Sequence, residues 1–576
     1  MRILLLTHSY NSLTQRLHTE LAARGHELTI EFDIADSVSE EAVELFKPDL
    51  VVAPYLRRAI PESIWKRHMC FIVHPGIVGD RGPSALDRAI QEGVAEWGVT
   101  VLQAEAEMDA GPVWASETFA MRDASKSSLY RNEVTAAACR AVLAAVERYA
   151  SGRFVPLRPD LTPLRPLLKQ DERRIDWQGD DTQTVLRKIA AADGFPGVAD
   201  QLFGEPCHLY DAHAESSIRG GRPGDIIARC ETALLRATAD GAVWIGHVRR
   251  HAHGIKLPAA VAFADEAAAL TELPLGSWWA AESQMWQDIF YREADGVGYL
   301  HFEFYNGAMG TRHCQRLLQA YHWALTRPTR VVVLMGGADF WSNGIHLNLI
   351  EAAESPADES WANINAMNDL AEAIIRTGSH LTVAALHGNA GAGGCFLARA
   401  TDMMWLRDGV LLNPHYKNMG NLYGSEYWTY LLPQRVGEEG ARAIMRNRLP
   451  LTAQAAVECG FADAQLPGDS AAFLAEVARR AHGLAHAEDL PRHLANKKMR
   501  RSADEAAKPL KQYRKEELAQ MRRNFYGFDP SYHVARYHFV RKSPNSWTPR
   551  HLAPHRNPGW RVPAQPAGAI SLAAPI

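Results

Sequence analysis

The sequence lacks the features of a disulfide-bonded, metal-binding or membrane protein. Its seven cysteines are scattered and odd in number, and no two stand in a C-x-x-C pair, so neither a disulfide framework nor a zinc site is indicated. No other cluster of metal-ligating residues is visible. No apolar run approaches the length of a membrane-spanning helix, and the run after Met1 is too short for a signal peptide. We therefore expect a cytoplasmic protein with no bound metal.

An excess of charge of one sign is also lacking. The 62 Lys and Arg residues nearly balance the 66 Asp and Glu residues, which leaves a formal net charge of −4 over 576 residues. Such a balance does not indicate nucleic acid or a membrane surface as a partner. With 47% hydrophobic residues the composition is that of an ordinary globular protein, long enough for about three or four domains.

The first 150 residues alternate apolar runs with helical patterns. Residues 3–6 and 50–53 are continuous apolar runs, as expected for strands buried on both faces of a parallel sheet. Residues 12–24 have helical spacing and stop at Gly25. No G-x-G-x-x-G follows the first run, which argues against NAD or FAD. The pattern predicts an α/β domain with a largely parallel sheet.

The most informative stretch of this region, Cys70–Ile90, continues through residues 98–103 to Val113. It resembles the formyltransferase and formyl-hydrolase family that uses 10-formyltetrahydrofolate, in which Asn-x-His ends a strand and Asp-x-Gly follows later. His74 and Asp109 match the His and Asp of that family. The resemblance implies a Rossmann-like formyltransferase domain with these two residues as its catalytic pair.

The chemistry of formyl transfer suits such a pair. A proton must leave the nucleophile and reach the folate nitrogen, and a histidine supported by an aspartate can carry it in both directions near neutral pH. Without the surrounding motif, His74 would be interpreted as a structural histidine. The Asn of the family falls at Ile72, which cannot donate to an oxyanion, so another group supplies that donor or the chemistry is altered. Three residues fall where the family lines the folate pterin, mostly with backbone groups: Leu56, Arg57 and Glu107.

The middle of the chain is expected to be a connector followed by a small β domain. Residues 153–168 hold four prolines, so this stretch is extended and not helical throughout. The Ile-Asp-Trp at 175–177 and the Phe-Pro-Gly at 195–197 resemble the small β-barrel domain of methionyl-tRNA formyltransferase. Because the region carries no dense Lys and Arg cluster, we expect a structural platform rather than a tRNA-binding domain.

A glycine-rich stretch, Leu381–Ala398, is the most distinctive feature of the second half. Its apolar run ends at a glycine cluster, residues 387–394, and continues into a helical pattern. Such a strand–turn–helix leaves backbone N–H groups free to hold a negative oxygen. The spacing argues against a phosphate-binding loop or a dinucleotide site. Two interpretations remain, which are donors for a thioester oxyanion and a tight turn that allows close packing.

A second stretch, Arg330–Leu347, repeats the design of an apolar run followed by a turn. Together the two stretches resemble the crotonase (enoyl-CoA hydratase/isomerase) superfamily over residues 286–466. The resemblance implies an α/β fold that binds coenzyme A, with an oxyanion hole made by the backbone N–H groups of Ile345 and Gly393.

The usual acid and base carboxylates of that superfamily are missing, since their positions fall at Phe396 and near His415. Adding water to a double bond requires two carboxylates around a water molecule, so hydratase activity is not expected. Glu426 is instead a candidate general base, and Tyr416 is its candidate orienting or proton-sharing partner. The alternative is that Glu426 is a carboxylate that interacts with a helix dipole.

The two resemblances together define the predicted architecture. The predicted parts are a folate-binding formyltransferase-like domain over residues 1–155, a linker with a small β domain over 156–272, a crotonase-like domain with C-terminal helices over 273–545, and a tail over 546–576. Within the tail, residues 563–576 are rich in Ala and Pro and are expected to be disordered.

This order of modules resembles the HoxX family of hydrogenase maturation factors over nearly the whole chain. The resemblance implies carbon monoxide synthesis for a [NiFe]-hydrogenase from 10-formyltetrahydrofolate and coenzyme A, with formyl-CoA as the intermediate. Hydrogenase maturation proteins that receive the CO would be the partners. The alternatives are a formyltetrahydrofolate hydrolase that releases formate and a non-catalytic scaffold that binds folate and CoA.

Overall fold

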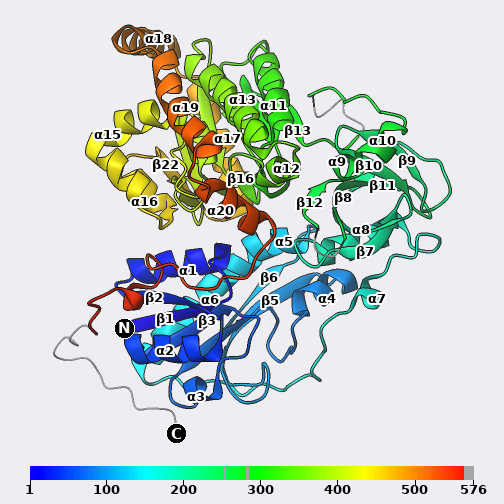
Figure 1. Ribbon diagram of the computed structural model, residues 1–576, viewed down its shortest axis with the longest axis vertical. Helices are drawn as coiled ribbons and strands as arrows, with labels where there is room; N and C mark the ends of the chain where they lie inside the picture. The colour runs from blue at the N-terminus through cyan, green and yellow to red at the C-terminus, as the bar shows by residue number, and fades with distance from the viewer. Residues whose placement is uncertain (252–253, 280–284, 563–576) are drawn as a thin grey trace. The chain divides into compact units, whose positions relative to one another are not determined.

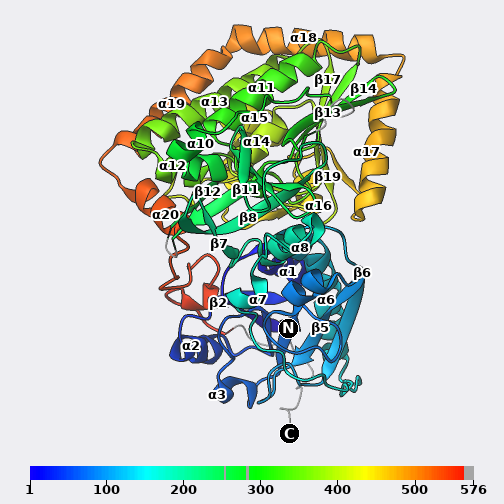
Figure 2. The ribbon, with the colours of Figure 1, turned by 90° about the vertical axis from the view of Figure 1, so that its right-hand side faces the viewer.

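The computed structural model describes residues 1–251, 254–279 and 285–562. The chain forms two compact units. The first comprises Met1–Ala212 together with the end of the chain from Pro544, and the second comprises His213–Ser543. Figures 1 and 2 show the elements of each unit in two views. Within the described residues, no helix is both long and apolar enough to cross a membrane.

The first unit is built on a six-stranded sheet with the order β2-β1-β3-β4-β5-β6. The first four strands of this order are parallel, β5 is antiparallel to β4, and β6 is antiparallel to β5. The strands are β1 (Arg2–Thr7), β2 (Glu27–Phe32), β3 (Leu50–Tyr55), β4 (Cys70–His74), β5 (Glu96–Gln103) and β6 (Val113–Ala120). The apolar runs predicted as buried strands form β1 and β3, which confirms the predicted α/β sheet.

Helices cover both faces of this sheet (Figure 1). Helix α2 (Asp36–Phe46) packs its Phe46 against Leu4 and Leu6 on one face. Helices α1 (Ser12–Ala23) and α6 (Thr135–Ser151) pack together on the other. The predicted helix over residues 12–24 is α1, and Asn11 caps it by accepting a hydrogen bond from the N–H of Thr14. The remaining helical segments of the region are α3 (Glu62–Trp65), α4 (Ala85–Glu92), α5 (Lys126–Leu129) and η1 (Tyr130–Val134).

The end of the chain returns to the edge strand β2. The N–H of Ile30 donates to the carbonyl of Leu552 at 2.8 Å, and the buried carboxylate of Glu31 accepts from Thr548, His555 and Arg556. Capping an edge strand in this way removes its free backbone groups from solvent. The described part of the predicted tail therefore contacts the first unit, through segment η3 (Pro554–Arg556) among others. The disorder predicted for residues 563–576 lies outside the described residues.

The proline-rich connector is extended, as predicted, and runs over the loop that follows β4. The N–H of Thr162 donates to the carbonyl of Gly79 at 3.0 Å, and the N–H of Arg165 donates to the carbonyl of Arg81 at 3.2 Å. A Cβ at Gly82 would lie 2.0 Å from the carbonyl oxygen of Arg165, so only glycine permits this approach. The connector is thus part of the wall around the end of β4.

Beyond the connector a second sheet follows, with the order β7-β8-β11-β10-β9 and β12 paired to β11. Strand β8 runs through the boundary between the two units. The elements of this region are α7 (Gln170–Arg173), α8 (Thr182–Ala192), β7 (Val198–Leu202), β8 (Glu205–Glu215), β9 (Ile226–Cys230), β10 (Ala233–Ala237), β11 (Ala242–Arg250), β12 (Lys256–Pro258), α9 (Ala259–Ala262) and α10 (Ala264–Ala268).

The second unit centres on a sheet with the order β13-β14-β15-β17-β19-β22, parallel from β14 onward. Alternate residues of β15 face two different cores: Val332 and Leu334 join one, and Val331 and Val333 join the other. Burial on both faces explains the continuous apolar runs of the sequence. The strands of this sheet are β13 (Ile289–Ala294), β14 (Val297–Phe302), β15 (Val331–Leu334), β17 (Leu381–Leu386), β19 (Met403–Arg407) and β22 (Ala464–Leu466).

A smaller sheet, β16-β18-β20-β21, follows the ends of the main strands. Each of β15, β17 and β19 is followed along the chain by one strand of this second sheet. Its members are β16 (Phe340–Ser342), β18 (Asn389–Gly391), β20 (Leu411–Asn413) and β21 (Leu451–Thr452). This arrangement brings the turns after β16 and β18 together, and these are the two turns that the sequence analysis singled out.

Helices surround the two sheets, with α17 on the opposite side of the main sheet from α11 and α13 (Figure 2). The predicted C-terminal helices are present as α17 to α20, between Ser470 and Val540. The helical segments are η2 (Tyr305–Gly307), α11 (Thr311–Ala324), α12 (Leu347–Ala352), α13 (Pro356–Arg376), α14 (Gly393–Arg399), α15 (Trp428–Arg446), α16 (Ala453–Glu458), α17 (Ser470–Ala485), α18 (Leu490–Ala507), α19 (Leu510–Tyr526) and α20 (Ser531–Val540).

Candidate functional site

The structure brings His74 and Asp109 of the first unit together. His74 is the last residue of β4 and is buried, and its Nδ1 lies 3.6 Å from Oδ2 of Asp109. Asp109 has a left-handed backbone (φ 52°), and the same Oδ2 accepts the N–H of Gly82 at 3.1 Å. The aspartate is thus held against one nitrogen of the imidazole, as a partner that orients a histidine would be.

A second carboxylate, Asp80, which the sequence analysis did not single out, faces the other nitrogen of His74. Its Oδ2 lies 3.0 Å from Nε2 of His74, and its Oδ1 accepts from Arg165 of the connector at 3.2 Å. Burial alone would raise the pKa of Asp80, but the contacts with His74 and Arg165 outweigh burial and hold this pKa below its ordinary value. His74 therefore lies between two carboxylates, one of which is anchored from the connector.

The loop between His74 and Asp80 has no space for a side chain at Gly76. A Cβ there would lie 2.3 Å from Nε2 of His74 and 2.6 Å from Oδ2 of Asp80. The carbonyl of Gly76 accepts from the hydroxyl of Thr100 on β5 at 2.8 Å. Glycine thus allows the loop to pass directly over the imidazole.

The residues predicted to line the pterin lie on the loops around this centre. Leu56 and Arg57 follow the end of β3, the strand next to β4. The guanidinium of Arg57 lies 5.3 Å from the ring centre of Phe195, and the backbone N–H of Arg57 donates to Oδ2 of Asp33 at 3.0 Å. Glu107 lies in the β5–β6 loop with an exposed side chain, paired with Arg81 at 2.7 Å. Arg57 and Glu107 thus have protein partners for their side chains, and their contact with a ligand stays a prediction.

In the second unit, the turn after β16 lies beside the start of α14. A Cβ at Gly344 would lie 3.3 Å from the backbone nitrogen of Gly393. Gly393 is the first residue of α14, so its N–H has no acceptor within the helix. The residue before it, Ala392, has a left-handed φ of 47°. The two predicted oxyanion donors, Ile345 and Gly393, therefore belong to segments that lie against each other.

The carboxylate of Glu426 lies directly over Gly393. A Cβ at Gly393 would be 2.5 Å from Oε1 of Glu426, so glycine alone leaves room for the carboxylate. Oε2 of Glu426 accepts from the hydroxyl of Tyr416 at 2.6 Å. Both side chains are buried. The structure thus places the predicted base, its tyrosine partner and the predicted oxyanion donor at one point.

Burial sets the protonation of this pair. It raises the pKa of Glu426 to about 8; the nearby carboxylate of Glu517 adds to the increase, and the hydrogen bond from Tyr416 opposes it. Burial and the neighbouring carboxylate of Glu426 raise the pKa of Tyr416 as well. Tyr416 is therefore a neutral donor, and Glu426 is a carboxyl group able to gain and lose a proton near neutral pH.

The positions of the hydratase carboxylates hold other side chains. Phe396 is fully buried in α14 and stacks on Tyr416, with 5.8 Å between the ring centres. His415 is buried beside Tyr416 in the chain. An apolar ring at the first position cannot activate water, so this site contains the Glu426–Tyr416 pair in place of a hydratase pair.

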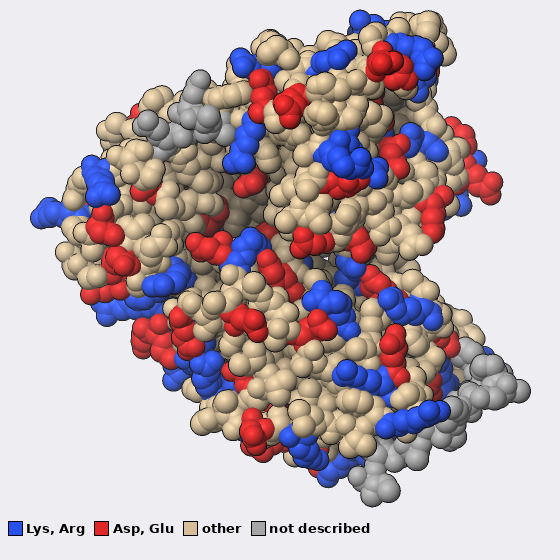
Figure 3. All heavy atoms as spheres, turned by 180° about the vertical axis from the view of Figure 1, so that it is seen from behind, with Lys and Arg blue, Asp and Glu red and all other residues tan. Residues whose placement is uncertain are grey.

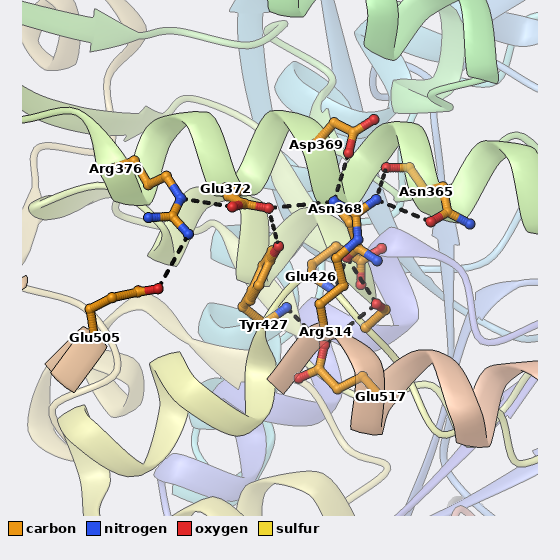
Figure 4. Close-up of polar contacts among 11 residues, drawn as sticks. Asn365, Asn368, Asp369, Glu372, Arg376, Glu426, Tyr427, Glu505, Arg514 and Glu517 are labelled. Carbon is orange, nitrogen blue, oxygen red and sulfur yellow. Dashed lines mark hydrogen bonds and ion pairs between the residues drawn. The ribbon is translucent and has the colours of Figure 1, made fainter. Parts of the chain in front are cut away.

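Two side chains that the sequence analysis missed contact the loop that carries Glu426 (Figure 4). Oδ1 of Asn368 on α13 accepts the N–H of Glu426 at 2.8 Å. The carboxylate of Glu517 on α19 accepts the N–H of Tyr427 at 3.0 Å. Both partners are distant in sequence and belong to no motif, so only the folded chain identifies them.

The face of the molecule in Figure 3 carries Lys and Arg side chains interspersed with Asp and Glu. Over the described residues of that face, neither sign gathers into a broad patch. Nucleic-acid binding requires clustered cations. This face therefore has no polycationic surface, in keeping with the balanced composition.

Comparison with protein families assigns each module. The formyl transferase family model matches residues 16–146, the formyl transferase C-terminal domain model matches 167–263, and the enoyl-CoA hydratase/isomerase model matches 300–549. The chain is 55% identical over 575 residues to the hydrogenase maturation factor HoxX of Bradyrhizobium diazoefficiens, and the match covers 99% of each protein. The chain belongs to the HoxX family of hydrogenase maturation factors.

The chain is also similar to a solved structure of a protein named HypX. The crystal structure of HypX from Aquifex aeolicus in complex with tetrahydrofolic acid is similar to this chain with a TM-score of 0.95 and 46% identity, covering 98% of this chain and 100% of that one. The methionyl-tRNA formyltransferase of Roseiflexus castenholzii is 30% identical over 205 residues, which cover 34% of this chain and 64% of that protein. The predicted family and α/β fold class are confirmed, and the roles of the site residues stay predictions.

Proposed function

We propose that this HoxX-family chain makes carbon monoxide for hydrogenase maturation in two steps. The first step transfers the formyl group of 10-formyltetrahydrofolate to the thiol of coenzyme A, and the second splits formyl-CoA into CO and CoA. The observation that carries the proposal is the carboxylate of Glu426, buried over Gly393 and hydrogen-bonded to Tyr416 in a crotonase pocket without hydratase carboxylates.

In the first step, Nε2 of His74, the nitrogen that faces Asp80 in this structure, takes the thiol proton while the sulfur forms a bond to the formyl carbon. The bond between that carbon and the folate nitrogen breaks, and His74 returns the proton to this nitrogen. Asp109 orients the imidazole through Nδ1. The formyl transferase family match and the tetrahydrofolic acid complex of the Aquifex aeolicus relative support a folate substrate at this site.

In the second step, the N–H groups of Ile345 and Gly393 face the formyl oxygen of formyl-CoA. Glu426 removes the formyl hydrogen as a proton, the carbon–sulfur bond breaks with its electron pair on sulfur, and CO leaves. The proton on Glu426 then passes to the thiolate and regenerates the thiol, so atoms and charge balance. Burial of the pair excludes water, which would hydrolyse the thioester to formate.

The test follows the labelled formyl carbon. Purified protein receives formyltetrahydrofolate labelled at that carbon, with and without CoA, and deoxyhaemoglobin traps the gas. We expect labelled CO only when CoA is present. Labelled formate without CO would overturn the proposal in favour of a formyltetrahydrofolate hydrolase, and no turnover of the label would favour a folate- and CoA-binding scaffold.

A substitution assigns the second step to its site. In Glu426→Gln we expect CO formation to fall while release of tetrahydrofolate continues. The matched control is Glu438→Gln, an exposed glutamate on the following helix α15. An equal loss of CO formation in Glu426→Gln and Glu438→Gln would contradict the assignment of decarbonylation to Glu426. Loss of tetrahydrofolate release in Glu426→Gln alone would contradict it as well.

A further inference from the structure

The loop that carries Glu426 has an unusual backbone. Glu426 and Tyr427 have φ angles of 59° and 60°, so two consecutive residues with side chains are left-handed. Each such residue is disfavoured by contacts of its Cβ, and a pair persists only where the surroundings hold it. The loop leads directly into α15, whose first residue is Trp428. The surroundings that hold this loop therefore also determine where the Glu426 carboxylate lies.

Glu517 of α19 holds the loop from one side. Its Oε1 accepts the N–H of Thr429 at 2.9 Å and the hydroxyl of Thr429 at 2.6 Å. Its Oε2 accepts the N–H of Tyr427 at 3.0 Å and lies 3.4 Å from the hydroxyl of Ser425. Because these N–H groups belong to the first turn of α15, they would otherwise lack acceptors. Glu517 thus acts as an N-terminal cap of α15, although it belongs to another helix, α19.

Asn368 of α13 holds the loop from the other side. Its Oδ1 accepts the N–H of Glu426 at 2.8 Å and the hydroxyl of Ser425 at 2.9 Å. Helices α13 and α19 are themselves tied together, because Arg514 pairs with Asp369 at 2.7 Å (Figure 4). The loop is therefore fixed between two helices that are joined to each other.

Glu517 is a buried glutamate, which is an unusual residue type for a purely structural role. It is fully buried, and burial raises its pKa to about 7, while the donors of the loop oppose the increase. A neutral acceptor such as an amide would carry no desolvation cost for charge. The start of α15 favours a negative charge through the helix dipole, and three donors converge on the carboxylate, the N–H of Tyr427 and the N–H and hydroxyl of Thr429. The arrangement fits an ionised Glu517 that acts on the loop and on the charge of Glu426.

We propose that Glu517 is a positioning residue of the second site, holding residues 425–429 so that the carboxylate of Glu426 lies over Gly393. The proposal rests on the proposed function, in which Glu426 is the base that removes the formyl hydrogen. Glu517 itself contacts the loop through Tyr427 and Thr429. It acts on the chemistry through Glu426 and not by touching the substrate.

The first experiment measures the loop and does not depend on the reaction. The variant Glu517→Gln keeps the shape of the side chain but replaces one acceptor oxygen by an NH2 group, which cannot accept the loop N–H groups. We expect hydrogen exchange of the amides of residues 427–429 to accelerate at least about 10-fold, as measured by mass spectrometry. The matched control is Glu516→Gln, the exposed neighbour on α19 that pairs with Lys508. Unchanged exchange in Glu517→Gln would overturn the proposal.

A milder variant keeps the test valid if Glu517→Gln does not fold. Thr429→Val removes one hydroxyl donor to Glu517 and leaves both backbone donors in place. We expect exchange of the amides of residues 427–429 to accelerate here too, by a smaller factor than in Glu517→Gln. Exchange identical to that of the native chain would contradict a role of this contact in holding the loop.

The second experiment measures CO release from added formyl-CoA. Because a displacement of about 1 Å of a reacting group can cost about 100-fold in rate, we expect kcat of Glu517→Gln to fall by about that factor, with KM within about 3-fold. We also expect the pH midpoint of kcat to move down, since removal of a nearby negative charge lowers the pKa of Glu426. The other titratable groups that act on Glu426, Tyr416 and Cys314, are unchanged in this variant.

The combined outcomes separate this inference from the proposed function. Faster amide exchange with an unchanged kcat would overturn the positioning role and leave a purely structural one. A lower maximal kcat without a shift of its pH midpoint would do the same. If the native chain releases no CO from formyl-CoA, the proposed function fails. The exchange measurement would then still decide whether Glu517 holds the loop.

Discussion

The two candidate sites use carboxylates in opposite ways. In the first unit, Asp80 is buried yet its pKa is held low, because His74 and Arg165 compensate its charge. In the second unit, the pKa of Glu426 is raised to about 8, because burial is opposed mainly by the neutral hydroxyl of Tyr416. Burial alone therefore does not decide what a carboxylate can do. The partner decides, since a cation fixes the charge and a neutral donor leaves a group that can exchange a proton.

The largest effect should come from removing the histidine of the first site. In His74→Ala we expect release of tetrahydrofolate to fall by about 1,000-fold, since general acid–base catalysis contributes about 100- to 10,000-fold. CO release from added formyl-CoA should stay at the native rate. A labelled-folate assay and a gas-trap assay measure the two steps separately. The control is His68→Ala, a histidine just before the same strand, and equal loss of both steps in His74→Ala would contradict the separation of the sites.

Removing the neutral donor of the second site should have the next largest effect. In Tyr416→Phe we expect CO release to fall by about 30-fold, since a hydrogen bond to a charged group contributes roughly 1.5–3 kcal/mol. That hydrogen bond lowers the pKa of Glu426, so its loss should move the pH midpoint upward. Tyr423→Phe, an exposed tyrosine of the same segment, is the control. A midpoint that moves downward would contradict the role of Tyr416.

The pH dependence of the second step distinguishes the two kinds of carboxylate. Glu426 acts as a base only when ionised, and its pKa is raised to about 8. The ionised fraction, and hence the CO release rate, should rise about 10-fold from pH 7 to pH 9. A stopped-flow measurement with formyl-CoA over this range checks the rise. A rate that is flat from pH 6 to pH 9 would show that the base ionises well below pH 6 and that burial does not control it.

The smallest effect should come from the anchored carboxylate of the first site. In Asp80→Asn the amide keeps a contact with His74 but loses its charge, and we expect tetrahydrofolate release to fall by about 5-fold. The control is Glu92→Gln, which removes the other, exposed ion-pair partner of Arg165 and should change little, since exposed ion pairs contribute about 0–1 kcal/mol. If the two variants behave alike, the contact between Asp80 and His74 has no function in the first step.

Residues with a local pattern could be predicted from the sequence. His74 and Asp109 lie within a stretch that resembles the formyltransferase family, and Gly393 lies in a glycine cluster that resembles the crotonase superfamily, so the resemblances pointed to these residues, whose roles stay predictions. Phe396 at a carboxylate position could be recognised in the same way. The α/β character of both units followed from continuous apolar runs such as residues 381–386, since strands buried on both faces have that pattern.

Residues that act only through the tertiary fold could not be predicted. Arg165 reaches Asp80 across 85 positions, and Glu517 reaches Tyr427 across 90. Neither belongs to a repeat or motif, because one lies in a proline-rich connector and the other in a highly charged helix. Only the path of the backbone decides which of many similar charged residues is buried against a loop.

The attachment of the chain's end to β2 has a consequence for the order in which the protein matures during synthesis. Glu31 is fully buried, and its partners Thr548, His555 and Arg556 follow the second unit in the sequence and are therefore translated after it. A buried carboxylate without its donors is strongly unfavourable. The first unit therefore gains these donors for Glu31 only after the second unit has been translated. A message that stops before residue 544 would leave the edge strand β2 without its contacts to Leu552 and to the donors of Glu31.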